Sequence, residues 1–369
     1  MDRLKTVDAA GPAEAAGAPT PSTPSGRLAW VDVVKGVAIC LVVLHHTTQE
    51  LGQVSAMPSA LVNLDQQLAS FRMPLFFFAS GLFAARTLTS TWGTVWRRRV
   101  LFFSWVYVLW SVVQHVAARA LPSATPGDDP TRTLDLLVGL VHPSTVLWFL
   151  YALAVFSIVV RAARGVPPGV HLALAAVVAV LVGGKVVPVD DYAWRSMGAY
   201  YVFFVAGVHH RALVDRLVAR VTWPRALAVA TFYAACAYTV GELVPDKPPG
   251  VRLALSCAAL AAGASLAVVL APSRLGAVLS WLGQRTLPVY VAHFPLVLAL
   301  VAPLVVTGWR PGAPVAVGLL AAITVVALVL PLLLERGAAR VGAGWLYRPP
   351  GRLSAPPTGP TGPSRAAVR

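Results

Sequence analysis

The sequence predicts an all-α integral membrane protein, a polytopic bundle of about ten transmembrane helices, on the basis of three observations. Hydrophobic residues make up 57% of the 369 residues and charged residues only 12%, about half the charged share of soluble domains. The mean hydropathy is +0.69, and several apolar runs reach the roughly 18 residues that indicate a membrane span. The formal net charge of +15 arises between those runs rather than on one basic face, so we expect no nucleic-acid partner.

The apolar runs define ten predicted spans and two tails. Residues 1–27 and 349–369 are rich in Ala, Pro, Ser, Thr and Gly and are expected to be disordered tails. Residues 28–348 then form one membrane domain. Its predicted spans, taken in order from the apolar pattern, are 33–53, 60–85, 99–118, 145–161, 168–189, 197–212, 223–243, 252–271, 286–306 and 313–334.

The basic residues predict the orientation of these spans. Of the 30 Lys and Arg residues, 21 lie in the tails and alternate loops on one side, whereas seven lie in the loops on the other side. Cytoplasmic loops carry the excess of Lys and Arg, so both termini are expected in the cytoplasm. The composition is typical of a GC-rich bacterial genome, which favours a multi-pass protein of a bacterial plasma membrane.

The first span, which contains "VVKGVAICLVVLHHT", carries a lysine at one end and two histidines deep inside. Lys35 and His46 are eleven residues apart, which is about three full helical turns and about 16 Å, so they share one face. His45 points away from that face, and Asp32 lies one turn before Lys35, where it can pair with it. Two interpretations stay open: a snorkelling anchor with an interhelical hydrogen bond, or a charged mouth with a general base.

The order of several motifs resembles the membrane-bound acyltransferase-3 family. The first helix resembles the family signature of a basic residue, ten intervening residues and a histidine, which Lys35 and His46 fit. Lysine in place of the usual arginine resembles the fucose O-acetylase-like subgroup, within the glycan O-acyltransferases. Further motifs follow in the family's order: "SFRMPLFFFASGLFAAR" (70–86), "WRRRVLFFSWVYVLW" (96–110), "LWFLYALAVF" (147–156), "YYVFFVAGV" (200–208) and "TLPVYVAHFPL" (286–296).

This resemblance implies a function. It implies an acyl-CoA-dependent O-acyltransferase that moves an acyl group, most commonly acetyl, to a hydroxyl of a sugar of a cell-envelope glycan, of a lipid-linked saccharide or of a glycosylated metabolite. His46 would deprotonate the acceptor or relay the acyl group, and Lys35 would position the donor. The partners would be acyl-CoA as co-substrate, the saccharide acceptor and membrane lipids, with no bound cofactor and no metal. The oligomeric state, the acceptor and the acyl chain length stay open.

A basic cluster precedes the third span. Arg97, Arg98 and Arg99 are expected to bind the phosphates of coenzyme A, because guanidinium groups match phosphate oxygens. Positive-inside anchoring is the alternative.

Four further residues are candidates for the acceptor side. Arg72 needs a partner inside the membrane, either the acceptor, a lipid headgroup or Asp65. Trp148 would stack on a sugar ring or lie at the membrane interface. Tyr290 and His293 match the family's Tyr-x-x-His pattern, and a structural hydrogen bond of His293 is the alternative.

A protein of another class would carry some of the same features. A transporter of a lipid-linked saccharide or of a hydrophobic small molecule would also use buried histidine and arginine in a helical bundle. A structural partner of another envelope enzyme is a third possibility. Only the acyltransferase would consume acyl-CoA.

Overall fold

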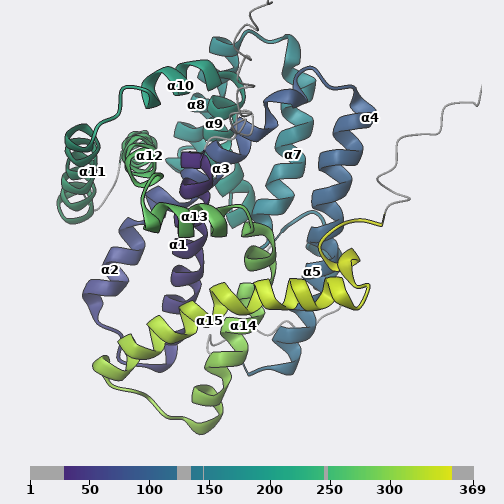
Figure 1. Cartoon of the computed structure of the whole chain (residues 1–369), viewed down its shortest axis with the longest axis vertical. Coiled ribbons are helices and arrows are strands. Elements are labelled where there is room, and N and C mark those ends of the chain that lie inside the picture. The colour runs from purple at the N-terminus through teal and green to yellow at the C-terminus, as the bar shows by residue number, and fades with distance from the viewer. Residues whose placement is uncertain (1–28, 123–133, 144, 245–247, 351–369) are drawn as a thin grey trace, which may run out of the picture.

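The computed structural model describes residues 29–122, 134–143, 145–244 and 248–350. These residues form helices and no strands, which confirms the all-α prediction; the predicted tail 1–27 and most of 349–369 lie outside them. Figure 1 shows the helices, whose bounds are α1 (Ala29–Val54), α2 (Ser59–Gln67), α3 (Ala69–Ala84), α4 (Trp92–Val95), η2 (Trp96–Val100), α5 (Leu101–Ala120), α6 (Leu134–Val138), α7 (Trp148–Ala162), α8 (Pro168–Gly183), α9 (Tyr192–His209), α10 (Arg211–Val218), α11 (Trp223–Leu243), α12 (Val251–Leu270), α13 (Arg274–Gly283), α14 (Thr286–Thr307) and α15 (Ala313–Arg340), with short 3₁₀ turns at η1 (Ala85–Thr87), η3 (Ala163–Gly165) and η4 (Gly344–Leu346).

Eight helical segments within the described residues are long and apolar enough to cross a membrane. Each corresponds to one of the ten predicted spans, so the chain is a polytopic membrane bundle. The eight segments are Ala29–Val54, Ser59–Thr87, Trp92–Ala120, Trp148–Gly165, Trp223–Leu243, Val251–Leu270, Thr286–Thr307 and Ala313–Arg340.

The fifth and sixth predicted spans, 168–189 and 197–212, are not among these eight segments. α8 is apolar but has only 16 residues, because the chain turns after Gly183 and Lys185 adopts a φ of +59°. α9 begins at Tyr192, five residues before the predicted start, because the Asp191 carboxylate accepts a hydrogen bond from the Trp194 N–H and caps the helix. The two helices pack against each other, and α9 also packs along α3.

α1 lies at the centre of the bundle, in contact with α3, α12, α13, α14 and α15. α13 crosses its first turns very closely: a Cβ on Gly36 would stand 2.0 Å from the Leu279 carbonyl oxygen, and one on Gly283 would stand 1.8 Å from that of Asp32. Both distances are far below van der Waals contact, so only glycine permits this approach. The crossing holds the start of α1, which carries Lys35, in one orientation.

The second predicted span is two helices joined at Leu68. Pro74 in α3 lacks the N–H that would bond the Ser70 carbonyl, and the Ser70 hydroxyl donates back to the Gln67 carbonyl at 3.0 Å. The helical hydrogen bond that Pro74 removes thus lies in the first turns of α3, just after the joint. The joint separates Asp65 in α2 from Arg72 in α3, and these two side chains form an ion pair.

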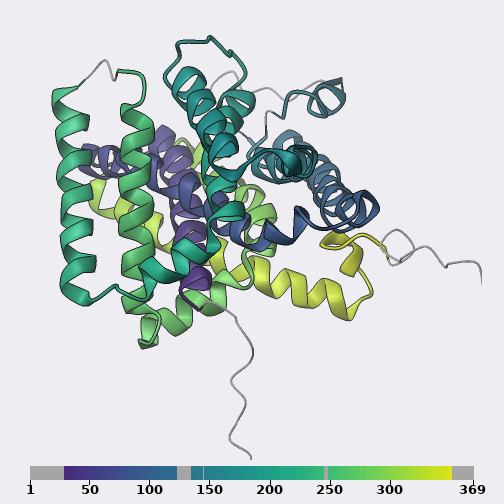
Figure 2. The same ribbon diagram turned by 90° about the horizontal axis from the view of Figure 1, so that it is seen from above.

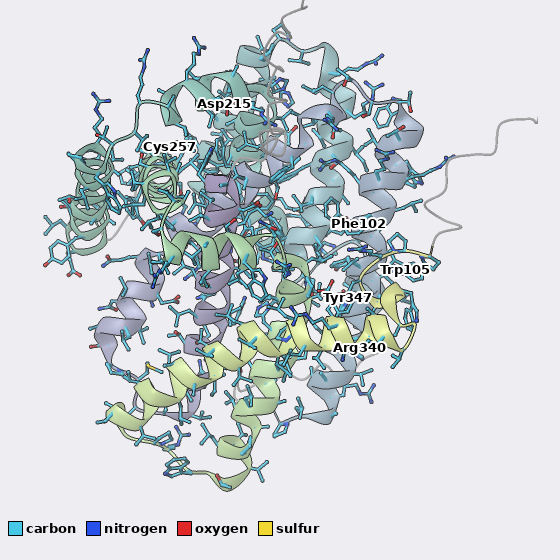
Figure 3. The ribbon with its side chains drawn as sticks, viewed as in Figure 1. Phe102, Trp105, Asp215, Cys257, Arg340 and Tyr347 are labelled. Carbon is cyan, nitrogen blue, oxygen red and sulfur yellow. The ribbon has the colours of Figure 1, made fainter. Side chains whose placement is uncertain are left out.

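The two edges of the bundle differ. α11 and α12 lie side by side as a hairpin in both views (Figures 1 and 2). At the other edge the chain returns after α15 and η4 packs on α5, where Trp105 and Tyr347 lie near each other (Figure 3). The indole N–H of Trp105 donates to the Trp345 carbonyl and that of Trp110 to the Leu346 carbonyl, each at 2.8 Å.

Candidate active site

Lys35 lies at the end of the bundle where α1 begins. Its ammonium Nζ is 3.1 Å from the Asp32 carboxylate, which confirms the pairing that their spacing predicts, and it lies 5.0 Å from the centre of the Phe83 ring. Asp32 is buried, whereas the lysine side chain keeps 19% exposure. The lysine is therefore held in place while its charge still faces an opening.

That opening is a cavity of about 530 Å³, which we term the Lys35 cavity. Cationic side chains lie along it together with an aromatic and aliphatic wall. The cations are Lys35, Arg86, Arg98 and Arg99; the apolar wall includes Phe76, Phe83, Phe102, Phe103, Phe149, Leu150, Leu153 and Leu287; Tyr290 also lines it. A cavity of this kind suits a ligand with an anionic part and an apolar part.

The arginine cluster reaches this cavity because of an irregular helical turn. Trp96–Val100 forms a π-helical turn between α4 and α5, a distortion often found at functional sites. Arg98 and Arg99 line the cavity and Arg97 does not, so the turn divides the three predicted residues. The Arg99 guanidinium donates to the Phe83 carbonyl at 2.6 Å, which ties it to the end of α3.

A row of aromatic rings leads from the Lys35 cavity into the bundle. The ring of Tyr290, at the cavity, lies 6.0 Å from that of His293 one turn later in α14. The His293 ring lies 5.3 Å from that of His46 in α1, and the His46 ring lies 5.0 Å from that of His45, centre to centre. We term Tyr290, His293, His46 and His45 the histidine row; it brings together three of the predicted site residues.

His293 is fully buried, and its hydrogen bonds define its tautomer. Its Nδ1 lies 2.7 Å from the Tyr290 carbonyl and 3.1 Å from that of Val289. Carbonyls only accept, so Nδ1 carries the hydrogen and donates it. Nε2 then keeps its lone pair, and it has no hydrogen-bond partner among the described residues. An imidazole in this state can accept a proton from a neighbour.

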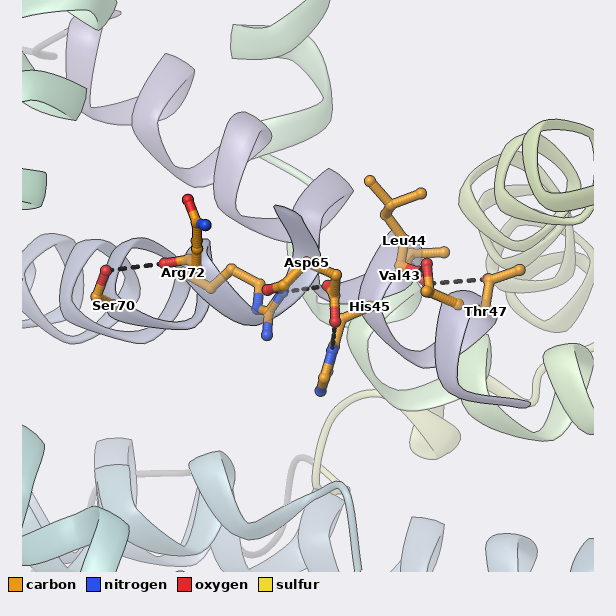
Figure 4. A network of polar contacts seen from close by, with 9 residues as sticks. Val43, Leu44, His45, Thr47, Asp65, Ser70 and Arg72 are labelled. Atoms are coloured by element: carbon orange, nitrogen blue, oxygen red, sulfur yellow. Dashed lines mark hydrogen bonds and ion pairs between the residues drawn. The ribbon is translucent and has the colours of Figure 1, made fainter. Parts of the chain in front are cut away.

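His45, which the sequence sets apart from His46, belongs to a second polar network (Figure 4). Its Nδ1 lies 2.7 Å from one oxygen of the Asp65 carboxylate, and Arg72 donates to the other oxygen and, at 3.0 Å, to the Asp65 carbonyl. Arg72 is therefore paired with Asp65, one of the alternatives that the sequence leaves open. All three residues line a cavity of about 510 Å³, which we term the Arg72 cavity.

Trp148 lies within an aromatic cluster of the core. It is buried, its ring lies 6.4 Å from that of Tyr200 in a stacked arrangement, and it contacts Phe77. This position differs from that of a tryptophan at a lipid interface. The indole instead supports the face of Tyr200.

Sequence reasoning missed two functional candidates that the structure brings in. Arg86 joins the cations of the Lys35 cavity, and its position at the end of an apolar span was the available signal. His45 acquires its carboxylate partner from α2, and that contact depends on the joint at Leu68, for which the sequence offers only Pro74 as a sign.

Comparisons with known proteins give the family. Inner membrane protein YcfT of Escherichia coli (strain K12) is 30% identical over 152 residues, a stretch that covers 36% of this chain and 43% of YcfT. No solved structure matches the chain. Residues 28–335 match the acyltransferase-3 family, described as an acyltransferase domain. Because this match covers most of the chain and the fold is a multi-pass helical bundle, the chain belongs to the acyltransferase-3 family.

Proposed function

We propose that this protein is a membrane acyltransferase, which takes an acyl group, in the first instance acetyl, from cytoplasmic acyl-CoA and transfers it to a hydroxyl of a sugar, glycan or glycosylated metabolite. The observation that carries the proposal is the Lys35 cavity. Its arginines, Arg86, Arg98 and Arg99, suit the phosphates of coenzyme A, and its aromatic wall suits the acyl thioester. Lys35 then lies where the thioester end enters.

The histidine row supplies the proton transfer in this proposal. His46 takes the proton of the acceptor hydroxyl, with the His293 Nε2 lone pair beside it. The acceptor oxygen bonds to the thioester carbonyl carbon, the carbon–sulfur bond breaks, and the coenzyme A thiolate leaves and takes up the proton. A relay through an acyl-imidazole on His46 is the variant of this step, and rapid quenching with labelled acyl-CoA in the absence of acceptor would trap it.

The acceptor enters from the opposite end of the bundle. The Arg72 cavity lies at the ends of α1 and α2 and the start of α3, whereas the Lys35 cavity lies at the start of α1 and the end of α3. The paired Arg72, Asp65 and His45 would orient the acceptor hydroxyl toward His46, 5.0 Å from His45 between ring centres.

The positive-inside pattern and YcfT, which its description places in the inner membrane, support a bacterial plasma membrane as the location. In this orientation both termini and the Lys35 cavity face the cytoplasm, where acyl-CoA is made.

The experiment that tests the proposal uses the full chain in nanodiscs with radiolabelled acetyl-CoA and a panel of glycosides. The proposal expects acceptor-dependent release of coenzyme A and label in the glycoside. Binding of acyl-CoA with no transfer to any hydroxyl acceptor, together with transport of a saccharide in proteoliposomes, would favour the transporter instead.

A further inference from the structure

A third cavity, of about 490 Å³, lies at the same end as the Arg72 cavity, and we term it the Tyr200 cavity. Five helices line it, α2 and α3 at their joint, α9 along its first half, and the α11–α12 hairpin, together with Lys185 from the turn after α8. None of the residues in which the catalytic proposal places chemistry lines it. The cavity therefore has no role in the proposed acyl transfer.

The side chains that line the Tyr200 cavity carry more positive than negative charge. Lys185, Arg195 and Arg252 line it, and Glu242 is the one acidic side chain among the described residues that line it. Within the part of the chain that the structure describes, no ion pair joins any of these three cations to a carboxylate. Three cations at one cavity repel one another unless an anion lies between them.

Two of the cations reach the cavity from the turn between α8 and α9 and from the start of α9. Lys185 adopts a left-handed backbone conformation, with a φ of +59°, which a non-glycine residue keeps only where the surrounding structure imposes it. Arg195 donates to the Val189 carbonyl at 3.1 Å, and its guanidinium lies 5.9 Å from the centre of the Tyr192 ring. Both cations are thus placed at the cavity by the turn between α8 and α9.

The remaining lining suits a saccharide. Tyr192 and Tyr200 supply aromatic faces, and Asn63 and Gln67 supply amide groups that donate and accept hydrogen bonds. The Tyr200 ring is kept in place by stacking against Trp148, with 25° between the planes. Aromatic faces beside amides recognise the apolar faces and the hydroxyls of a sugar ring.

The Tyr200 cavity adjoins the catalytic region. Gln66 and Ala69, on the two sides of the α2–α3 joint, line both this cavity and the Arg72 cavity. A ligand larger than one sugar ring can therefore occupy both cavities, with one part near Lys185 and another near Arg72.

We propose that the Tyr200 cavity binds an anionic group, a phosphate or a carboxylate, on the saccharide acceptor, so that the acceptor class is an acidic saccharide. Its place in acyl transfer rests on the proposed function, but binding itself does not. The anionic group engages Lys185, Arg195 and Arg252, a sugar ring lies against Tyr200, and the hydroxyl to be acylated extends past Gln66 toward Arg72.

The test is binding without any acyl donor. Saturation-transfer difference NMR measures the affinities of glucose 1-phosphate and of methyl glucoside for the full chain in phosphatidylcholine nanodiscs. Glucose 1-phosphate should bind at least about tenfold more tightly than methyl glucoside, because a hydrogen bond to a charged group raises affinity about 10- to 100-fold. Arg195→Gln and the double variant Lys185→Gln/Arg252→Gln should each remove most of that difference, and Arg252→Lys should keep it.

Two control variants locate the bound phosphate. Arg119→Gln removes an exposed charge at the end of α5, away from the described cavities, and should leave binding unchanged. Arg98→Gln alters the Lys35 cavity and should also leave it unchanged. Equal binding of the two sugars, or a loss caused by Arg98→Gln and not by the Tyr200-cavity variants, would overturn the proposal.

A lipid headgroup carries the same phosphate chemistry, so a second arm uses nanodiscs that contain phosphatidylglycerol. Retained sugar-phosphate binding supports an acidic saccharide; its loss in those discs contradicts it and assigns the cavity to a lipid. If the protein acylates neutral glycosides at rates that the Tyr200-cavity variants do not change, this inference is wrong and the proposed function stands. If the protein binds glucose 1-phosphate as expected but acylates no acceptor, the proposed function is wrong and this inference stands.

Discussion

The two ends of the bundle both carry clusters of cations, yet their walls differ. At the Lys35 cavity the cations border phenylalanine and leucine side chains, whereas at the Tyr200 cavity they border amides, hydroxyls and tyrosine rings. Charge alone would not separate an acyl-CoA from an acidic sugar, because both are anions. The comparison indicates that the wall selects the ligand: an apolar wall accepts a thioester chain, and a polar wall accepts hydroxyls.

The two ends are also held together differently. Near Lys35 the start of α1 is fixed by the glycine-lined crossing with α13, a contact of backbone with backbone. At the other end, the α2–α3 joint is bridged by the buried ion pair of Arg72 and Asp65. The α1–α13 crossing therefore depends on shape, and the α2–α3 joint on a paired charge.

The largest expected effect lies between the two ends, in the histidine row. His46→Ala should lower the rate of acyl transfer by at least about 100-fold, because a positioned general base contributes about 10²–10⁴-fold. His45→Ala is the matched control and should retain far more activity, since His45 faces the Asp65 carboxylate rather than His293. Initial rates at normal membrane insertion measure both. An essential His45 beside a dispensable His46 would reverse the assignment.

The next effect tests the acceptor end. Arg72→Ala leaves the Asp65 carboxylate without its cation at a buried position. The free energy of unfolding should fall by about 3 kcal/mol. This value is in the lower part of the range for breaking a buried ion pair, because the pair borders the Arg72 cavity. Thermal unfolding in detergent measures it, and Arg72→Met combined with Asp65→Leu should recover much of the loss. An Arg72→Ala protein as stable as the wild type would show that the pair does not hold the joint.

A smaller effect tests the donor end. Arg98→Gln should raise the apparent KM for acyl-CoA about tenfold, the value of one charge-assisted hydrogen bond, and leave the KM for the acceptor unchanged. Arg97→Gln is the matched neighbour, which does not line the cavity, and should change the donor KM much less. Equal effects of the two variants on both substrates would assign the cluster to membrane anchoring.

The smallest effect is expected for Lys35→Arg, which keeps the charge beside Asp32 and Phe83. This variant should keep most of the activity, whereas Lys35→Ala should lose much more of it. The ratio of their kcat/KM values for acyl-CoA is the measurement. Similar activity in the two variants would mean that the charge of Lys35 has no role in binding the donor.

Much of the fold follows from the sequence because a membrane span needs a long apolar run and little else. Each of the ten predicted segments is occupied by a helix, and the errors arise where local contacts decide the outcome. Asp191 starts α9 early, and Lys185 turns the chain after α8. α13 is short and lies between two spans, so hydropathy does not mark it, although it packs on α1.

The candidate site is less accessible to sequence reasoning, because it depends on contacts between helices. The spacing of Lys35 and His46 follows from one helix, but the meeting of His46 with His293 depends on how α1 packs on α14. Likewise, Arg98 and Arg99 reach the cavity and Arg97 does not because of a π-helical turn, which composition does not reveal. The Tyr200 cavity gathers residues from five helices, so no single motif predicts it.

In the proposed function, acyl-CoA binds at the Lys35 cavity and the acceptor binds at the opposite end of the bundle. The most direct measurement is photolabelling of the full chain in nanodiscs with an acyl-CoA that carries a photoreactive acyl chain, followed by peptide mass spectrometry. We expect labels on the wall of the Lys35 cavity, among residues 76–103, 149–153 and 286–290. Unlabelled coenzyme A should compete these labels away, and Arg98→Gln should weaken them. Labels on residues 185–200 or 252–255, which line the Tyr200 cavity, displaced by glucose 1-phosphate, would contradict this expectation.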